Sequence, residues 1–464
     1  MNLTVPGAVA ALESAFSELL RESPRGFEAF ESSAKRIADA CCAEAMGRAL
    51  GARDRELAAS RPEGSRIHSR RPRTLATLSG DVRFERTLLL DAAGSTSCPL
   101  DEELGLPLGD RVSPAARTFL VTCGADVPFA RTARLMAMAG GSAVSATTVM
   151  NSLRRAGEAV AELERAAASD LFRDGVPPEA DSEASHVLVE ADGTYVRMRD
   201  GSTAEVKAVV AYAGKAEEGG KVMRDRPVRI GCVGEAPGAF WEQAVAQVGR
   251  RFDLAGIERV SLGTDGEAQY VNGSGAFRCG DVRGFLDPFH VFRAVGACAP
   301  APDGAALVDM LRTGGPEACA DAIDDLLGDG GACAHAGDVA SYLRRHAAEI
   351  GGGPSMGTME AEQQHVYKAR MGSFPCSWSR EGADAMARTR SWLASGFGLP
   401  RRTREGSRSP RRSARREERL AAYVSAKPGS RVKCEGKGWE YPVSGSLAGL
   451  RADVRYVGAG RPLG

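Results

Sequence analysis

The chain has 464 residues, of which 60 are basic and 60 acidic, so its formal net charge is zero, and 43% of its residues are hydrophobic. At roughly 100–200 residues per domain this length predicts about three domains, and the composition excludes both a disordered chain and a uniformly basic, histone-like protein. No apolar run reaches the roughly 18–20 residues that span a bilayer, and the N-terminus has no basic segment that would indicate a signal peptide. The eleven cysteines are scattered and form no CxxC pair, which indicates reduced thiols. We therefore expect a cytoplasmic protein.

The N-terminal part of the chain is predicted to be helical and then to form a hairpin. Residues 1–60 carry apolar residues every three or four positions, which is the spacing of one helix face. The Pro-, Ser- and Arg-rich stretch 61–73 is typical of a linker. A β-hairpin is expected after it, because two apolar runs flank the turn sequence Ser79-Gly80-Asp81. We therefore group residues 61–110 as one hairpin region.

Residues 111–180 are predicted to be helical and to contain a helix-turn-helix. Gly140-Gly141 breaks the first helical pattern, and Ser145 is placed to cap a second helix. The second helix would expose side chains suited to DNA, namely Asn151, Arg154 and Arg155. An ordinary αα-hairpin is the alternative, and the spacing alone favours it.

From residue 185 the pattern is rich in strands. Strands are expected at 186–198, 205–214 and 226–234, then a helix at 240–256 and a fourth strand at 258–266. Three strands, a helix and a further strand is the order of the ribonuclease H-like fold, although other α/β and α+β domains share parts of it. Residues 291–355 lack strand signals and are predicted to be an all-helical insertion, and a further helix is expected within 360–395.

A basic run follows the predicted core. Residues 401–419 hold nine Arg against three Glu, with Ser and Pro between them. A solvated linker and a phosphate-binding tail fit this composition equally well. Residues 420–464 carry no clear signal, so we treat 396–464 as an Arg-rich linker and C-terminal tail.

Two aspartates occupy positions suited to a divalent cation. Asp192 lies in the middle of an expected strand, where an acid is unfavourable unless it is paired or binds a cation. Asp265 ends the fourth expected strand, and Mg²⁺ prefers such carboxylate oxygens. Two aspartates in ordinary Asp-Gly turns are the alternative, and the residues alone favour it.

Three further residues are candidates for the same chemistry. Asp287 and His290 form an Asp-x-x-His pair, although a helix N-cap followed by an ordinary histidine has the same pattern. Glu360 lies near the start of the helix after the insertion, where the helix dipole also favours a glutamate. Glu362 competes with it for the same role.

Five segments, in chain order, resemble a known family: EADGTYV, EVKAVVAYAG, GTDG, FLDPFHVFRAV and EAEQQHVYKARMGSFPCSWSREGADAMARTR. They are similar to the ISLre-type insertion-sequence transposases, a bacterial family distantly related to the Mutator-like DDE transposases. The resemblance covers about residues 75–395. Relatives often carry a CxxC pair between the hairpin and the PLDE segment, and here only Cys98 remains, so the hairpin region resembles a zinc ribbon that has lost ligands.

The resemblance implies a mixed α/β (α+β) fold. Its ribonuclease H-like catalytic core would comprise residues 181–395 and contain the all-helical insertion at about 291–355. The helical and helix-turn-helix regions would precede this core.

The resemblance also implies the catalytic residues. Asp192, Asp265 and Glu360 correspond to a DDE triad that binds two Mg²⁺ or Mn²⁺ ions and cuts and joins DNA. Asp287 and His290 match the DxxH motif that Mutator-like enzymes carry before the insertion.

The partner that the resemblance implies is double-stranded DNA, both the terminal inverted repeats of the element and the target DNA. The protein would bind this DNA as a homo-oligomer, in the bacterial nucleoid and not at a membrane. The helix-turn-helix would read the repeats. A set of arginines would hold the DNA backbone, namely Arg370, Arg401, Arg402, Arg411 and Arg412. Two alternatives stay open: a non-catalytic DNA-binding protein descended from a transposase, and a ribonuclease H-like nuclease without strand transfer.

Overall fold

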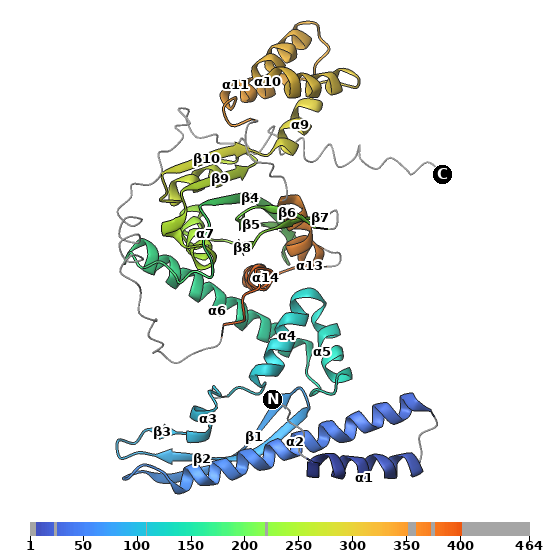
Figure 1. The fold of residues 1–464 in the computed structure, drawn as a ribbon, viewed down its shortest axis with the longest axis vertical. Helices are drawn as coiled ribbons and strands as arrows, with labels where there is room; N and C mark the ends of the chain where they lie inside the picture. Colours follow the sequence, from blue (N-terminus) through green and yellow to red (C-terminus); the bar gives the residue numbers. More distant parts are fainter. Residues whose placement is uncertain are drawn as a thin grey trace. The chain divides into compact units, whose positions relative to one another are not determined.

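The structure is a computed structural model that describes residues 6–22, 26–107, 109–218, 221–350, 359–372 and 376–400. It is a mixed α and β protein with several sheets (Figure 1). By its contacts the described chain divides into two compact units, built mainly from Met1–Ala156 and from Gly157–Gly398. Among the described residues, no helix has the length and apolar character needed to cross a membrane.

The Arg-rich run lies outside the described residues. Arg401, Arg402, Arg411 and Arg412 belong to it, so their expected contacts with the DNA backbone stay predictions.

The first unit begins with two helices and a hairpin. The helices are α1 (Pro6–Glu22) and α2 (Phe27–Ala59), and the sheet contains β1 (Arg66–Thr77), β2 (Gly80–Leu90) and β3 (Thr96–Ser97). Strands β1 and β2 pair antiparallel, as the hairpin prediction requires.

The predicted linker at 61–73 is partly wrong, because β1 already begins at Arg66. A strand at the edge of a sheet tolerates exposed arginines, and Arg70 and Arg71 are exposed. Arg73 is buried instead and forms an ion pair with Asp101, with 2.6 Å between Nη1 and Oδ1.

Four helices follow the hairpin, namely α3 (Pro99–Glu103), α4 (Pro114–Asp126), α5 (Phe129–Met138) and α6 (Ala146–Phe172). The first unit ends within α6, at Ala156, and the rest of α6 belongs to the second unit. Helices α5 and α6 are the two helices of the predicted helix-turn-helix. The turn between them needs glycine, because Gly140 has φ +94° and an added Cβ would lie 2.0 Å from Asp39 Oδ2. The Ser145 hydroxyl accepts a hydrogen bond from the Thr148 amide at 3.1 Å, which caps α6 as expected.

The second unit contains a five-stranded sheet. Its strands are β4 (His186–Arg197), β5 (Thr203–Tyr212), β8 (Val228–Cys232), β9 (Arg259–Thr264) and β10 (Asp281–Leu286), in the order β10-β9-β4-β5-β8. Strand β5 runs antiparallel to β4 and β8, whereas β9 is parallel to β4 and β10 is parallel to β9. Strand β10 was not predicted, since it lies at the sheet edge and includes the polar Arg283.

Shorter elements connect these strands. They are the hairpin of β6 (Lys215–Glu218) and β7 (Lys221–Arg224), helix α7 (Pro237–Arg251), the 3₁₀ turn η1 (Leu254–Gly256), helix α8 (Ala268–Val271) and the 3₁₀ turn η2 (Asn272–Ala276).

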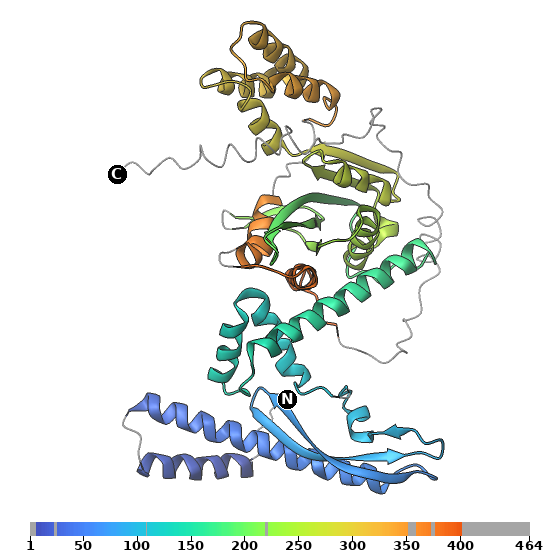
Figure 2. The ribbon, with the colours of Figure 1, turned by 180° about the vertical axis from the view of Figure 1, so that it is seen from behind.

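The two faces of the sheet differ in chemistry, and β4 shows this by its alternation. Val187, Val189 and Ala191 point into the main hydrophobic core, which α6 and α7 complete on that face (Figures 1 and 2). Glu190 and Asp192 alternate with them and therefore lie on the opposite face.

That opposite face is covered by α12 (Met359–Glu362), the π-helical turn η3 (Gln363–Lys368) and α13 (Ala369–Met371), after which α14 (Arg380–Ala394) packs against β8. The Tyr367 hydroxyl donates to the Ile230 carbonyl at 3.2 Å. Gly231 permits this approach, because an added Cβ would lie 2.3 Å from the Tyr367 hydroxyl oxygen.

The segment predicted to be a helical insertion contains α9 (Pro288–Gly296), α10 (Asp303–Gly328) and α11 (Ala336–Arg345), and its residues 351–355 lie outside the described part of the chain. Helix α10 bends at Gly315, where φ is +86°. These helices have their own hydrophobic core, centred on residues such as Val295, Ile323 and Leu343. The Leu286 amide donates to the Glu349 carbonyl at 3.0 Å, which joins the end of the bundle to the end of β10.

Candidate metal centre

Three aspartates lie at one edge of the sheet, and the strand directions explain why. Asp265 directly follows β9 and Asp287 directly follows β10, so parallel strands bring both to their common carboxyl end. Asp192 lies in β4 one position beyond Ala191, which pairs with Thr264 at the end of β9. The Asp287 amide also donates to the Thr264 carbonyl at 2.8 Å.

These aspartates border one small cleft. The residues that line it are Glu190, Ala191, Asp192, Gly263, Thr264, Asp265, Asp287, His290 and Met359. Asp192 is only 6% exposed, and its Oδ1 accepts a hydrogen bond from the Gly193 amide at 2.7 Å. Asp265 Oδ1 accepts one from the Glu267 amide at 3.0 Å. Both carboxylates are therefore held in defined orientations.

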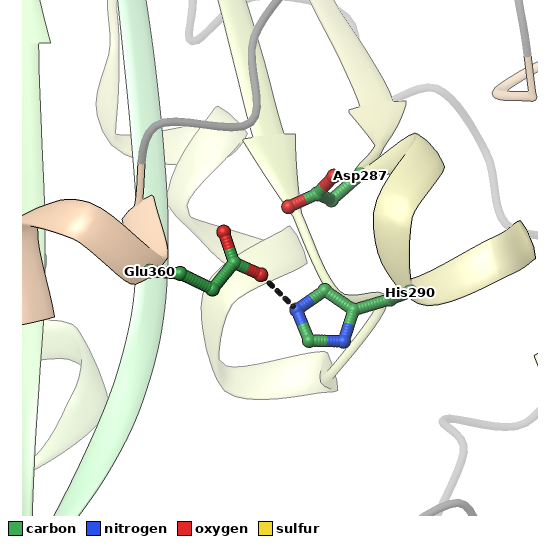
Figure 3. Close-up of side chains that lie close together, drawn as sticks. All are labelled: Asp287, His290 and Glu360. Carbon is green, nitrogen blue, oxygen red and sulfur yellow. Dashed lines mark ion pairs between the residues drawn. The ribbon is translucent and has the colours of Figure 1, made fainter. Parts of the chain in front are cut away.

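The most compact group of possible metal ligands consists of Asp287 and His290, which line the cleft, and Glu360, which lies beside them (Figure 3). One ligand atom from each lies within 4.8 Å of the other two, and no other group of three His, Cys, Asp or Glu in the described part of the chain is as compact. Asp287 precedes α9 and His290 follows three residues later, so both reach the same side of that helix end. Glu360 comes from α12, and its Oε1 lies 3.1 Å from His290 Nε2.

The charges in the cleft favour a protonated histidine beside ionised carboxylates. Burial alone lowers the pKa of His290, but the hydrogen bond to Glu360 and the charges of Asp192 and Asp287 outweigh burial and raise the pKa. Burial raises the pKa of Glu360, but the hydrogen bond from His290, a backbone hydrogen bond and the charges of His290 and Lys368 together outweigh burial, so the pKa of Glu360 falls. The cleft thus carries excess negative charge, which attracts a cation.

The structure distinguishes the two glutamates that compete for the last acid position. Glu360 faces Asp287 and His290, whereas Glu362 is buried and points to the opposite side of its helix turn. There it forms ion pairs with Arg224 and Arg229, and the Arg229 Nε lies 2.7 Å from Glu362 Oε2. Glu362 therefore has a structural role.

The donor atoms of the cleft suit a divalent cation. The carboxylate oxygens of Asp192, Asp265, Asp287 and Glu360 are the hard ligands that Mg²⁺ and Mn²⁺ prefer. Of the predicted triad, Glu360 joins the compact group with Asp287 and His290, and Asp192 and Asp265 line the same cleft.

The predicted DNA-contacting residues have different surroundings. Arg154 is exposed and Asn151 is half-buried on α6, whereas Arg155 forms an ion pair with Asp110 at 2.8 Å. Arg370 requires a correction, because it is only 8% exposed and its guanidinium lies over the Trp378 ring, 5.2 Å from the centroid. A side chain buried in this way does not present its charge to a DNA backbone.

Sequence reasoning missed one residue of the site, Gln363. Its amide nitrogen lies 2.6 Å from Asp192 Oδ2. Gln363 follows Glu360 by three positions, and that helical spacing is the signal that would have indicated it.

Comparison with known proteins shows that this chain is similar to the members of one family. The model of a family described as "Uncharacterised protein family (UPF0236)" matches residues 24–302. A UPF0236 protein of Caldanaerobacter subterraneus subsp. tengcongensis is 22% identical over 337 residues, which cover 70% of this chain and 69% of that protein.

Two further relatives are similar over shorter stretches. A second UPF0236 protein of the same organism, whose name combines eleven locus designations, is 21% identical over 193 residues, 41% of this chain and 38% of that protein. The "UPF0236 protein in vanSb 3'region" of Streptococcus gallolyticus is 26% identical over 182 residues, 39% of this chain and 37% of that protein.

Proposed function

This chain belongs to the uncharacterised protein family UPF0236, and from the geometry of its cleft we propose that it is a DNA transposase of an insertion sequence, of the ISLre type. It acts on double-stranded DNA, cutting at the terminal repeats of the element and joining them to a target. The chemistry is phosphoryl transfer with two Mg²⁺ or Mn²⁺ ions.

One observation carries the proposal: acids from distant parts of the chain lie in or beside one cleft. Asp192 from β4 and Asp265 from the end of β9 line the cleft. Glu360, from the helix after β10 and the helices that follow it, lies beside the cleft residue His290, with 3.1 Å between Oε1 and Nε2. The strand order β10-β9-β4-β5-β8, with β5 antiparallel and β9 and β10 parallel to β4, supports a ribonuclease H-like core. A fold alone does not establish a reaction, so the proposal depends on the carboxylates.

The protein's part in the reaction is to position charge. Two bound cations would lower the pKa of the attacking water or 3′-hydroxyl and stabilise the leaving oxygen. Asp192, Asp265 and Glu360 would hold these cations, and Asp287 and His290 border the same position. The carboxylates are fixed before DNA arrives, so little reorganisation is needed when charge develops on the phosphate.

Other observations agree with DNA as the partner. Helices α5 and α6 are arranged as a helix, a turn and a helix, and the exposed Arg154 lies near the start of α6. One relative's name combines eleven locus designations of a single strain, and repeated copying of a gene within a genome is what a mobile element produces.

A cleavage and strand-transfer assay tests the proposal. Labelled duplexes carrying the DNA that flanks the gene are incubated with the full chain and Mg²⁺ or Mn²⁺. We expect Asp192→Asn, Asp265→Asn and Glu360→Gln to abolish both cleavage and joining, because each removes a ligand charge with little change of shape. DNA binding should persist in all three.

The control is Glu258→Gln, which changes an exposed glutamate outside the cleft and should leave every activity unchanged. Cleavage without joining would identify a nuclease instead. DNA binding without cleavage by the unmodified chain would identify a non-catalytic DNA-binding protein. Either result would overturn the transposase proposal.

A further inference from the structure

A buried glutamine connects Asp192 with the helix that carries Glu360. Gln363 is the first residue of η3, and it is only 4% exposed. Its Nε2 donates to Asp192 Oδ2 at 2.6 Å and to the Gly193 carbonyl at 3.0 Å. Both partners are acceptors, so the amide nitrogen, and not the amide oxygen, must face them.

We propose that Gln363 is a positioning residue, which holds the Asp192 carboxylate in the orientation that binds a divalent cation. The inference rests on the proposed function and adds a residue to its site. Gln363 touches Asp192 and not the reacting atoms, so it acts through that carboxylate.

The chemistry of the contact suits this task. The Gly193 amide already holds Asp192 Oδ1, and Gln363 holds Oδ2, so the carboxylate cannot rotate without losing a hydrogen bond. Each carboxylate oxygen has two lone pairs, so accepting one of these hydrogen bonds does not by itself prevent the oxygen from binding a cation. A neutral amide also leaves the full negative charge on Asp192, whereas a lysine or arginine at this place would neutralise it. Such outer partners of metal ligands commonly set ligand orientation.

The same contact fixes the distance between two parts of the site. Gln363 follows Glu360 by three residues, at the point where the helix changes to the wider π-helical turn. π-helical turns are frequent at functional sites. Two further contacts hold this part of the chain in place. Glu362 forms an ion pair with Arg229, and the Tyr367 hydroxyl donates a hydrogen bond to the Ile230 carbonyl. Asp192 and Glu360 are thereby held in one rigid arrangement.

The test compares two neighbouring glutamines. Gln363→Met keeps the length of the side chain and removes the donor, and Gln364→Met is the matched control, because Gln364 is exposed. In the full chain, Mn²⁺ affinity is measured from the rise of Tm with Mn²⁺ concentration, without DNA. We expect Gln363→Met to weaken Mn²⁺ binding by about 10- to 100-fold and to lower kcat for cleavage with an unchanged KM for DNA. The control should match the unmodified chain.

A second variant separates orientation from simple structural support. Gln363→Lys keeps a donor to Asp192 and adds a compensating charge, so the fold should be preserved while Mn²⁺ binding is lost. If Lys restores Mn²⁺ affinity and cleavage, Gln363 only supports the structure, and the inference is wrong. It is equally wrong if Gln363→Met binds Mn²⁺ as tightly as the unmodified chain.

These outcomes differ from failure of the proposed function. An unmodified chain that binds Mn²⁺ and cuts DNA, together with a fully active Gln363→Met variant, overturns the role of Gln363 alone. An unmodified chain that neither binds Mn²⁺ nor cuts DNA overturns both proposals.

Discussion

Glu360 and Glu362 lie two positions apart and have opposite surroundings. Glu360 is 41% exposed beside His290, and Glu362 is 6% exposed between Arg224 and Arg229. Removing one partner of a buried ion pair leaves the other charge uncompensated, which costs far more than losing an exposed charge. The same chemical change should therefore have different consequences at the two positions.

Glu362→Gln should lower the free energy of unfolding by about 1–3 kcal/mol, because Arg224 and Arg229 lose a charged acceptor inside the protein. Glu360→Gln should leave that free energy nearly unchanged and abolish DNA cleavage. Urea unfolding followed by circular dichroism measures the first effect, and the cleavage assay measures the second. An unstable Glu360→Gln together with a stable, inactive Glu362→Gln would show that the last acid is Glu362.

At the scale of elements, a buried arginine fastens α14 to the rest of its unit. Arg388 is fully buried, and its guanidinium bonds to Glu235 at 2.8 Å, to Asp384 at 2.9 Å and to Glu164 of α6. It also donates to Gln243 of α7 at 2.9 Å. Helix α14 contacts η3, so this network supports the turn that carries Gln363.

The network predicts a pH dependence of stability. Burial raises the pKa of Glu164 to about 7, even though Arg388 acts in the opposite direction. The folded chain therefore binds a proton more tightly at this position than the unfolded chain does, so stability should fall as pH rises from about 4.5 to about 7. Measuring Tm across this interval for the unmodified chain and Glu164→Gln isolates the effect, since glutamine does not titrate. An identical pH profile for both proteins would rule out a raised pKa at Glu164.

At the scale of the whole molecule, DNA affinity should depend on the Arg-rich run at 401–419. Nine Arg and three Glu give a local charge of 9 − 3 = +6. Each phosphate contact contributes about 0.9 to the slope of log affinity against log salt. Deleting the run should flatten that slope by several units and weaken binding to all sequences about equally, because we expect arginines between Ser and Pro residues to contact the DNA backbone rather than the bases.

Replacing 401–419 with a Gly- and Ser-containing segment of equal length is the control for linker length, and it should reproduce the deletion. An unchanged salt slope would mean that the run is only a solvated linker. Selective loss of binding to the terminal repeats would contradict our assignment of recognition to Asn151, Arg154 and Arg155.

The local periodicity of the sequence by itself determined much of the element order. The hairpin around Ser79-Gly80-Asp81, the break at Gly140-Gly141 and the helices after β10 are present as predicted. Asp287 and His290 could also be selected from the sequence, because three positions along one helix end suffice to bring them together. These features depend on residues that are close in the chain.

Only the tertiary structure decided which side chains meet in the cleft. Gln363 and Asp192 are 171 positions apart, and no local pattern encodes that contact. Glu360 and Glu362 are equivalent in sequence and differ only because arginines of β7 and β8 surround one of them. Arg370 similarly carries a charge that suggests DNA, yet the packing of Trp378 buries it. Charge and periodicity are properties of the local chain, whereas partners and burial are set by the packing of distant segments.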